Sequence, residues 1–136
     1  MLEVCEVGNS VSKEDYEAAI PDLRVGLINA QYDLRDADFP VIIWIAGDDR
    51  LAANELVNRL NEWMDARYLR THVFGDMSEA ERERPRFWRL WQAMPPKGRI
   101  AIWAGGLFRQ VTAHLSGDVG DAEFETWVSH LEALQA

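Results

Sequence analysis

The chain has 136 residues, of which 48% are hydrophobic and 27% charged, and both figures fit one globular domain spanning 1–136. Its formal net charge of −9 argues against a general surface for nucleic acid or anionic membranes, because such a surface has to be basic. Cys5 is the only cysteine in the sequence, so neither an internal disulfide nor a cysteine metal cluster can form.

The first residues, MLEVCEVGNS, contain neither a basic segment nor a long apolar core, so they do not resemble a secretion signal. No stretch approaches the roughly 18 consecutive apolar residues that suggest a membrane-spanning helix. Together with the single cysteine, these features lead us to expect a cytoplasmic protein with no membrane and no nucleic-acid partner.

Residues 1–11 are expected to form a loosely held arm, and residues 12–36 a helix. Ser12 is the expected N-cap of that helix, and Asp15 stands three residues later, as in a capping box. Pro21 interrupts the early part of the pattern and is expected to kink the helix or divide it.

The segment from Pro40 to Trp63 reads as strand, turn and helix. Val41–Ile45 is a continuous apolar run between Pro40 and Gly47, which predicts a strand buried on both faces, as in parallel sheets. Leucines then recur at helical spacing over 51–66. Phosphate-binding loops occur in this geometry, because the N–H groups at the helix N-terminus point toward the turn.

The rest of the chain continues the alternation of strands and helices. A strand is expected over 68–74. Ser78 and Glu81 form a capping box for the next helix, which Pro85 kinks or splits into two. A third strand is expected over 99–103, and helices over 107–115 and 122–134. This order predicts a parallel α/β sheet of about three strands with flanking helices.

Four stretches of this sequence resemble the polyphosphate kinase type 2 family: YEAAIPDLRVGLINAQYDL, FPVIIWIAG, ELVNRLNEWMDARYLRTHVF and SEAERERPRFWRLWQAMPPKGRIAIW. They cover roughly residues 12–115, and the likeness is closest to the N-terminal domain of two-domain polyphosphate:AMP phosphotransferases. The resemblance implies a three-layer P-loop-kinase-like fold in which the first and third strands are neighbours. It also implies phosphoryl transfer between inorganic polyphosphate and nucleotides with Mg²⁺.

The phosphate loop of that family has the pattern G-x-[DE]-x-A-G-K-G, which this chain keeps only in part. The equivalent residues are Gly47, Asp48, Asp49, Arg50, Ala52, Ala53 and Asn54. The lysine and the glycines beside it are missing, and they are the groups that neutralise phosphate and let backbone N–H groups approach it. The family's second motif, F-D-R-S-W-Y, corresponds here to 103–108, which lacks its acidic and basic members.

Because phosphoryl transfer depends on positioning and charge stabilisation, the degenerate loop predicts a non-catalytic unit that acts in assembly or regulation, without a cofactor. Two alternatives stay open: polyphosphate:nucleotide phosphotransfer to AMP or ADP, and binding of polyphosphate or nucleotide without turnover. If the chain is active, Asp49 is the expected catalytic acidic residue and Mg²⁺ the expected cofactor.

A basic region follows the second strand, and its members Arg84, Arg89, Lys97 and Arg99 are the candidate contacts for polyphosphate. The simpler interpretation is a solvated helix with ion pairs three and four residues apart, and the neighbouring glutamates favour it. Nearby, Trp88 and Trp91 lie three residues apart, which favours core packing or an interface over base stacking.

By the resemblance, the family domain continues past the last helix into a further strand and helix, so this chain is truncated relative to the family. The Val41–Ile45 strand then becomes an apolar sheet edge, which is an open template for pairing. We therefore expect a homodimer, or docking to a second chain, through that edge. His72, His114 and His130 share no ligand spacing, so no metal site is expected.

Overall fold

The structure of the protein is a computed structural model, which describes residues 10–47, 49–85 and 87–135. Most of the predicted arm, residues 1–9, therefore lies outside the described residues. Along the described chain the elements are α1 (Lys13–Leu34), β1 (Val41–Ile45), α2 (Arg50–Trp63), β2 (Leu69–Phe74), α3 (Glu79–Arg82), α4 (Trp88–Gln92), β3 (Ile100–Gly105), α5 (Leu107–Leu115) and α6 (Asp121–Gln135).

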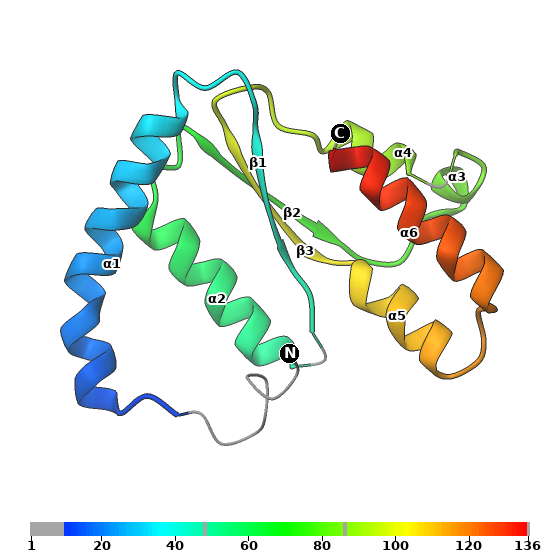
Figure 1. Ribbon diagram of the computed structural model, residues 1–136, viewed down its shortest axis with the longest axis horizontal. Coiled ribbons are helices and arrows are strands. Elements are labelled where there is room, and N and C mark those ends of the chain that lie inside the picture. Colours follow the sequence, from blue (N-terminus) through cyan, green and yellow to red (C-terminus); the bar gives the residue numbers. More distant parts are fainter. Residues whose placement is uncertain (1–9, 48, 86, 136) are drawn as a thin grey trace.

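The three strands form one parallel sheet in the order β1-β3-β2 (Figure 1). Ile100 lies opposite Val41 on one side and opposite Leu69 on the other, so all three strands begin at the same edge of the sheet. The predicted parallel sheet is confirmed, and so is the expectation that the first and third strands are neighbours.

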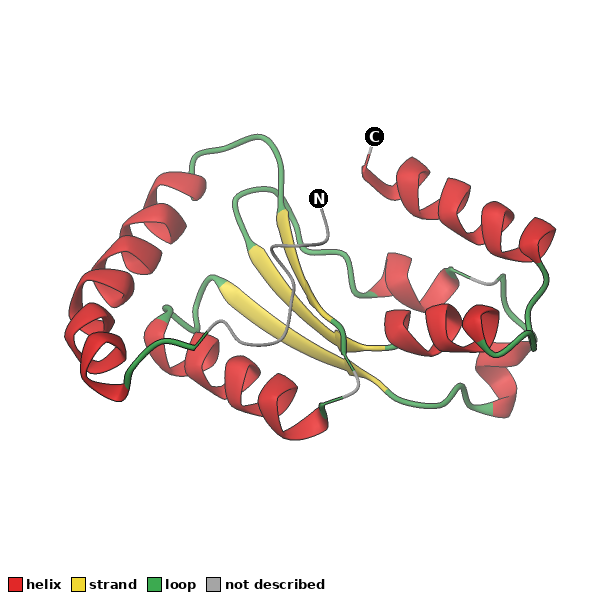
Figure 2. Ribbon diagram, turned by 60° about the horizontal axis from the view of Figure 1, so that its bottom comes forward, coloured by secondary structure: helices red, strands yellow, loops and turns green. Residues whose placement is uncertain are grey.

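Helices cover both faces of this sheet, which confirms the three-layer arrangement (Figure 2). On one face, side chains of α1 and α2 pack against a buried cluster that includes Ile45, Leu69 and Ile102. On the other face, Leu90 and Ala93 pack against alternate residues of the same strands. The two cores follow from the twofold alternation of side chains along a strand. No described helix is long and apolar enough to cross a membrane.

The most deeply buried strand is β3. From Ile100 to Ala104 its residues are all buried, and Ala101 and Ile102 have no exposed surface. By contrast, β1 is only half-buried from Val41 to Trp44, and burial is complete only at Ile45. The prediction of a β1 buried on both faces is therefore wrong, because β3 occupies the central position and β1 lies at the edge of the described sheet.

The two internal prolines have different consequences. Pro21 lies inside α1, which still runs unbroken from Lys13 to Leu34, so the helix is not divided there, and a kink at Pro21 stays a prediction. One lost hydrogen bond is tolerated there because good helix formers such as Ala19 and Leu23 flank the proline. At Pro85 the expected split is confirmed, since α3 and α4 are separate short helices. The capping box formed by Ser78 and Glu81 is also present.

Candidate functional site

The equivalent of the phosphate loop joins the carboxyl end of β1 to the first turn of α2. In open parallel sheets ligands bind beyond the carboxyl ends of the strands, so this loop is in the expected place for a phosphate site. Gly47, Asp49 and Arg50 are exposed here, and Asp48 lies outside the described residues.

The carboxylate of Asp49 caps α2. Its Oδ1 accepts hydrogen bonds from the backbone N–H groups of Leu51 at 2.9 Å and Ala52 at 3.0 Å. The N–H group of Ala53 donates to the Asp49 carbonyl oxygen at 3.0 Å. Three N–H groups at this helix N-terminus are thus already bonded within the chain, whereas a bound phosphate needs such groups free.

The position that holds the family's lysine is Ala53, and its side chain packs against the core beneath α2. Ala52 and Asn54, which replace the two glycines, are exposed on the outer side of the same turn. This first turn therefore presents neither a cationic side chain in place of the lysine nor the glycines that allow close backbone approach.

The structure divides the four predicted polyphosphate contacts between the two ends of the sheet. Arg89 donates from Nη1 to the carbonyl oxygen of Gly75 at 3.1 Å, directly after the carboxyl end of β2. Arg84 is near it, with its guanidinium 5.7 Å from the ring centre of Trp88. Lys97 and Arg99 come just before β3, at the amino edge. The four cations do not converge on one site.

Arg89 has a structural role in the turn after β2. Its guanidinium lies 4.9 Å from the ring centre of Phe74, and its side chain is 16% exposed. Its Nε lies 4.0 Å from the Glu81 carboxylate and has no hydrogen-bond partner. That carboxylate accepts a hydrogen bond from the N–H group of Ser78 at 2.8 Å, which lowers the pKa of Glu81.

Arg89 also lines a hollow of about 260 Å³ on the outer side of β2, together with His72, Val73, Phe74, Glu81, Trp88, Gln92 and Ala93. Trp91 is 56% exposed, so core packing does not hold for it, and Leu90 is the buried residue of α4. An interface at Trp91 stays a prediction.

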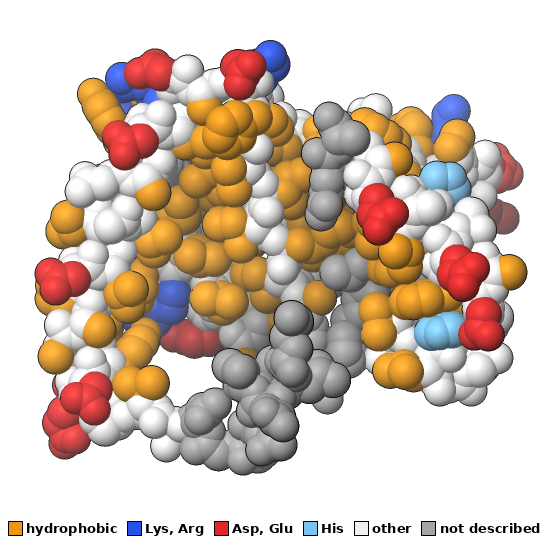
Figure 3. Space-filling view, in the orientation of Figure 1, with side chains coloured by type: hydrophobic (Ala, Val, Ile, Leu, Met, Phe, Trp, Pro, Cys, Tyr) orange, Lys and Arg blue, Asp and Glu red, His pale blue; other side chains and the backbone are white. Residues whose placement is uncertain are grey.

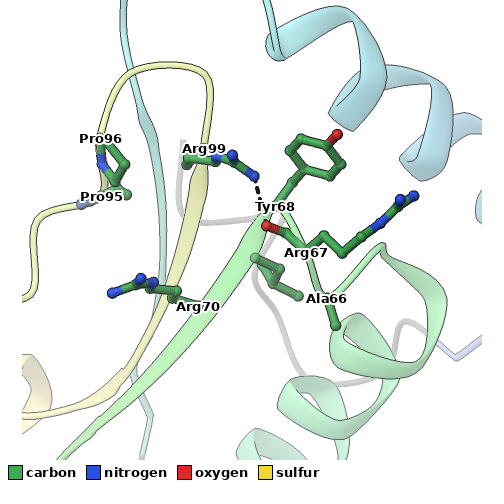
Figure 4. A pocket seen from close by; sticks show the side chains of 8 residues that line it. Ala66, Arg67, Tyr68, Arg70, Pro95, Pro96 and Arg99 are labelled. Atoms are coloured by element: carbon green, nitrogen blue, oxygen red, sulfur yellow. Dashed lines mark hydrogen bonds between the residues drawn. The ribbon is translucent and has the colours of Figure 1, made fainter.

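A second hollow, of about 320 Å³, lies at the amino edge of the sheet (Figure 4). Its lining residues are Ala66, Arg67, Tyr68, Leu69, Arg70, Pro95, Pro96 and Arg99. Of these, only Arg99 is a candidate from the sequence. The common start of parallel strands is the signal that could have found the others, because it brings arginines near the beginning of β2 beside an arginine just before β3.

Two of these arginines are fixed by contacts. Arg99 donates from Nη1 to the carbonyl oxygen of Arg67 at 2.6 Å and lies 4.3 Å from the ring centre of Tyr68. Arg67 forms a salt bridge of 2.6 Å to the carboxylate of Asp65. Hydrogen bonds from the Arg67 side chain and backbone lower the pKa of Asp65 to about 2.

Metal-binding chemistry is limited in the part of the chain that the structure describes. No group of three or more His, Cys, Asp or Glu side chains there is arranged to hold a metal ion. His72 lies on β2, and His114 stacks on Phe124 with ring centres 4.1 Å apart. His130 belongs to α6, where its ring packs against Phe87.

Comparison with known proteins gives one consistent family. The sequence profile described as Polyphosphate kinase 2 matches residues 10–135. Polyphosphate:AMP phosphotransferases from Pseudomonas aeruginosa and Pseudomonas syringae pv. tomato are 39% and 34% identical to this chain. Both alignments cover 99% of this chain but 28% of the relative, so the chain spans less than a third of the length of these curated relatives.

Comparison with solved structures gives proteins described with the same family name. A crystal structure described as a polyphosphate kinase 2 from Pseudomonas aeruginosa matches with a TM-score of 0.84 and 39% identity. The match covers 99% of this chain and 29% of the chain in that structure. A polyphosphate kinase 2 structure from Arthrobacter aurescens matches with a TM-score of 0.80. This match covers 93% of this chain and 47% of the chain in that structure. At 16% identity, the second match demonstrates a common fold alone.

Proposed function

The chain belongs to the polyphosphate kinase 2 family, and from this premise we propose that it is a non-catalytic unit of that family that acts through assembly. The observation that carries the first half of the proposal is Ala53, which stands where the family's loop has its lysine and packs against the core. The Asp49 cap supports it, because it occupies backbone N–H groups that a phosphate would need.

Among the described residues, the implied Mg²⁺ also lacks a suitable donor set. Magnesium in phosphoryl-transfer sites is held by one or two carboxylates together with the substrate phosphates. The Asp49 carboxylate is already engaged by two N–H groups, and Ala104 stands at the position of the acidic residue in the family's second motif. The described residues therefore do not fit the ion.

The second half of the proposal rests on the outer side of β1, which no described strand pairs. The N–H group of Val41 donates to the Arg99 carbonyl oxygen at 3.0 Å, so Val41 faces β3. Because backbone groups alternate along a parallel ladder, the N–H and C=O groups of Ile42 and Trp44 point away from β3. Figure 3 shows one face of the molecule, and hydrophobic side chains gather over its middle, where β1 runs in Figure 1.

We propose that the occupant of this edge is β1 of a second copy of the chain. A twofold axis would place two β1 strands antiparallel, so that the same apolar surface of both copies is buried and the sheet becomes continuous. Such an interface satisfies the outward backbone groups of both strands at once.

Multi-angle light scattering across a concentration series tests this interface. Ile42→Pro removes one outward N–H group and leaves the ladder to β3 intact, since proline is tolerated at an edge. We expect a dimer for the wild type and a monomer for this variant. The matched control is Val73→Pro, whose N–H group points outward from the other edge strand by the same alternation. A wild type that stays monomeric at high micromolar concentration contradicts the assembly proposal.

The non-catalytic half has a separate test. Purified protein is mixed with short-chain polyphosphate, Mg²⁺ and AMP or ADP, and formation of the phosphorylated nucleotide is followed. We expect no turnover, and measurable turnover by the wild type would overturn this half. The relatives' printed name, polyphosphate:AMP phosphotransferase, favours phosphotransfer as the second candidate, with Asp49 as the acidic residue. We propose a cytoplasmic setting, because the single cysteine suits a reducing compartment.

A further inference from the structure

The amino-edge hollow gathers positive charge in a chain of net charge −9. Ile100 donates to the Tyr68 carbonyl oxygen at 3.0 Å, so Tyr68 and Arg99 lie side by side just before their strands. Arg70 follows Tyr68 by two residues and therefore points to the same face of the sheet. The hollow lies at the opposite end of the sheet from the Asp49 loop.

The charges of these arginines are not equally compensated. Asp65 neutralises Arg67 through a salt bridge of 2.6 Å. Arg99 contacts a carbonyl oxygen and an aromatic ring, and the Asp65 carboxylate acts on it electrostatically without a salt bridge, so its charge is compensated only in part. Arg70 is exposed, and the described part of the structure gives neither Arg70 nor Arg99 a salt bridge to a carboxylate. The guanidinium of Arg70 thus remains available to an anion, and that of Arg99 in part.

The site is also partly ordered in advance. Arg99 is oriented by its 2.6 Å hydrogen bond and by the Tyr68 ring, so binding would fix few of its rotatable bonds. In Figure 4, Arg70 extends from β2 and Arg99 from the position just before β3, with Pro95 and Pro96 near Arg99. The two guanidinium groups point in different directions in this view, so a shared anion would require the exposed Arg70 side chain to turn toward Arg99. Prolines lack an N–H group, so Pro95 and Pro96 offer an apolar surface to a ligand.

We propose that this hollow binds a small phosphate-class dianion, with the guanidiniums of Arg70 and Arg99 as its ligands. Guanidinium donors match the geometry of phosphate oxygens, and two of them match a double negative charge. The volume of about 320 Å³ lies at the lower end of small-molecule sites, which leaves room for an ester group beside Tyr68 and the prolines. This inference goes beyond the proposed assembly and does not depend on it.

Calorimetric titration at low salt tests the site with three probes: inorganic phosphate, AMP and tripolyphosphate. Arg70→Gln removes one ligand from an exposed position, so folding should be retained, and we expect its affinity to fall about tenfold. The matched control is Arg50→Gln, which removes the same charge beside the Asp49 loop and should change affinity less than about twofold. The amide signals of Tyr68 and Ile100 should move on binding, while that of Gly47 stays in place.

Two results overturn the inference. One is the absence of saturable binding of all three probes to a folded wild type. The other is binding that Arg50→Gln weakens and Arg70→Gln does not, which would place the anion at the Asp49 loop. Comparison of the probes separates the sources of the anion. Tighter binding of AMP than of inorganic phosphate supports an ester contacting Tyr68 and the prolines, and equal binding supports recognition of the phosphate alone.

Discussion

Gln31 and Asp65 exchange two hydrogen bonds although they lie 34 positions apart in the chain. The Gln31 Nε2 donates to the Asp65 carbonyl oxygen at 3.0 Å, and the Asp65 N–H group donates to the Gln31 Oε1 at 2.7 Å. Gln31 is only 3% exposed. This side chain therefore ties the C-terminal half of α1 to the loop that carries the chain from α2 into β2.

Replacement of Gln31 by leucine should lower the free energy of unfolding by about 2 kcal/mol, because it leaves two backbone groups of Asp65 without partners in a partly buried place. Urea unfolding followed by tryptophan fluorescence measures the change. Gln31→Glu is the matched variant, since it keeps the acceptor and loses the donor. It should lower the free energy of unfolding nearly as much as Gln31→Leu. A loss well below 1 kcal/mol for both variants would mean that water replaces the side chain.

The carboxylate of Asp65 makes stability depend on pH. The Arg67 hydrogen bonds lower its pKa from 3.8 to about 2 in the folded protein. A lowered pKa stabilises the fold above the unfolded value, and this contribution is lost as the pH falls from about 4 to about 2. The difference in unfolding free energy between wild type and Asp65→Asn should therefore shrink over this window.

The carboxyl ¹³C signal of Asp65 gives a direct check, with an expected midpoint of about 2. Arg67→Gln removes the side-chain donor, so the midpoint should rise toward the ordinary value of an aspartate. A midpoint that is the same with and without the Arg67 guanidinium would show that the salt bridge is not formed in solution.

The Asp49 cap should also have a measurable effect on stability. Asp49→Ala removes the acceptor for two N–H groups of α2 and should cost about 1 kcal/mol of unfolding free energy. Asp49→Asn should restore most of that loss, because asparagine caps helices about as well. Thermal unfolding of the three proteins side by side makes the comparison, and equal midpoints for all three would show that the cap contributes nothing.

The parts of the fold that follow from local pattern were predictable from the sequence. The Ser78–Glu81 capping box and the break at Pro85 depend on residues close in the chain, and both are present. The burial of β1 was not predictable from its apolar run, because VIIWI at an edge and IAIWA at the centre look alike as sequences. Only the order of strands, which is a tertiary property, places β3 between the other two.

The same limit applies to the candidate sites. The missing lysine of the phosphate loop is visible in the sequence, but the bonding of Asp49 to Leu51 and Ala52 is not, because it depends on side-chain geometry. Arg84, Arg89, Lys97 and Arg99 lie within one segment of the sequence, so they suggest a single site there. The segment in fact passes from the carboxyl edge of the sheet to its amino edge and separates them.

Trp103 is the centre of the core on the α4 side. It is 1% exposed, its ring meets Trp44 and Phe74 edge to face at 5.3 and 5.5 Å, and its Nε1 donates to the Ala93 carbonyl oxygen at 3.3 Å. Trp103→Ala should lower the unfolding free energy by about 4 kcal/mol, through the cavity that it creates. Trp91→Ala, at an exposed position, should stay within about 0.5 kcal/mol of wild type, and similar losses at both positions would contradict this packing.

Rebuilding the phosphate loop tests whether the fold still holds this loop in a position to bind phosphate. Ala52→Gly, Ala53→Lys and Asn54→Gly together restore the lysine and its flanking glycines, and binding of tripolyphosphate is measured by calorimetry. Arg70→Gln is added to this variant and to its controls, so that the amino-edge hollow contributes little. Without the rebuilt loop we expect no saturable binding at the Asp49 end of the sheet.

With the rebuilt loop, saturable binding should appear and should weaken as salt is raised. Asn58→Lys, one turn further along α2, is the matched control for added charge and should not produce it. Ala53 packs against the core, so the lysine costs some stability, and circular dichroism must show that the variant is folded. If a folded, rebuilt loop stays inert, the Asp49 cap is itself the block, because it still engages the N–H groups of Leu51 and of residue 52. Asp49→Ala in the rebuilt loop should then release the binding.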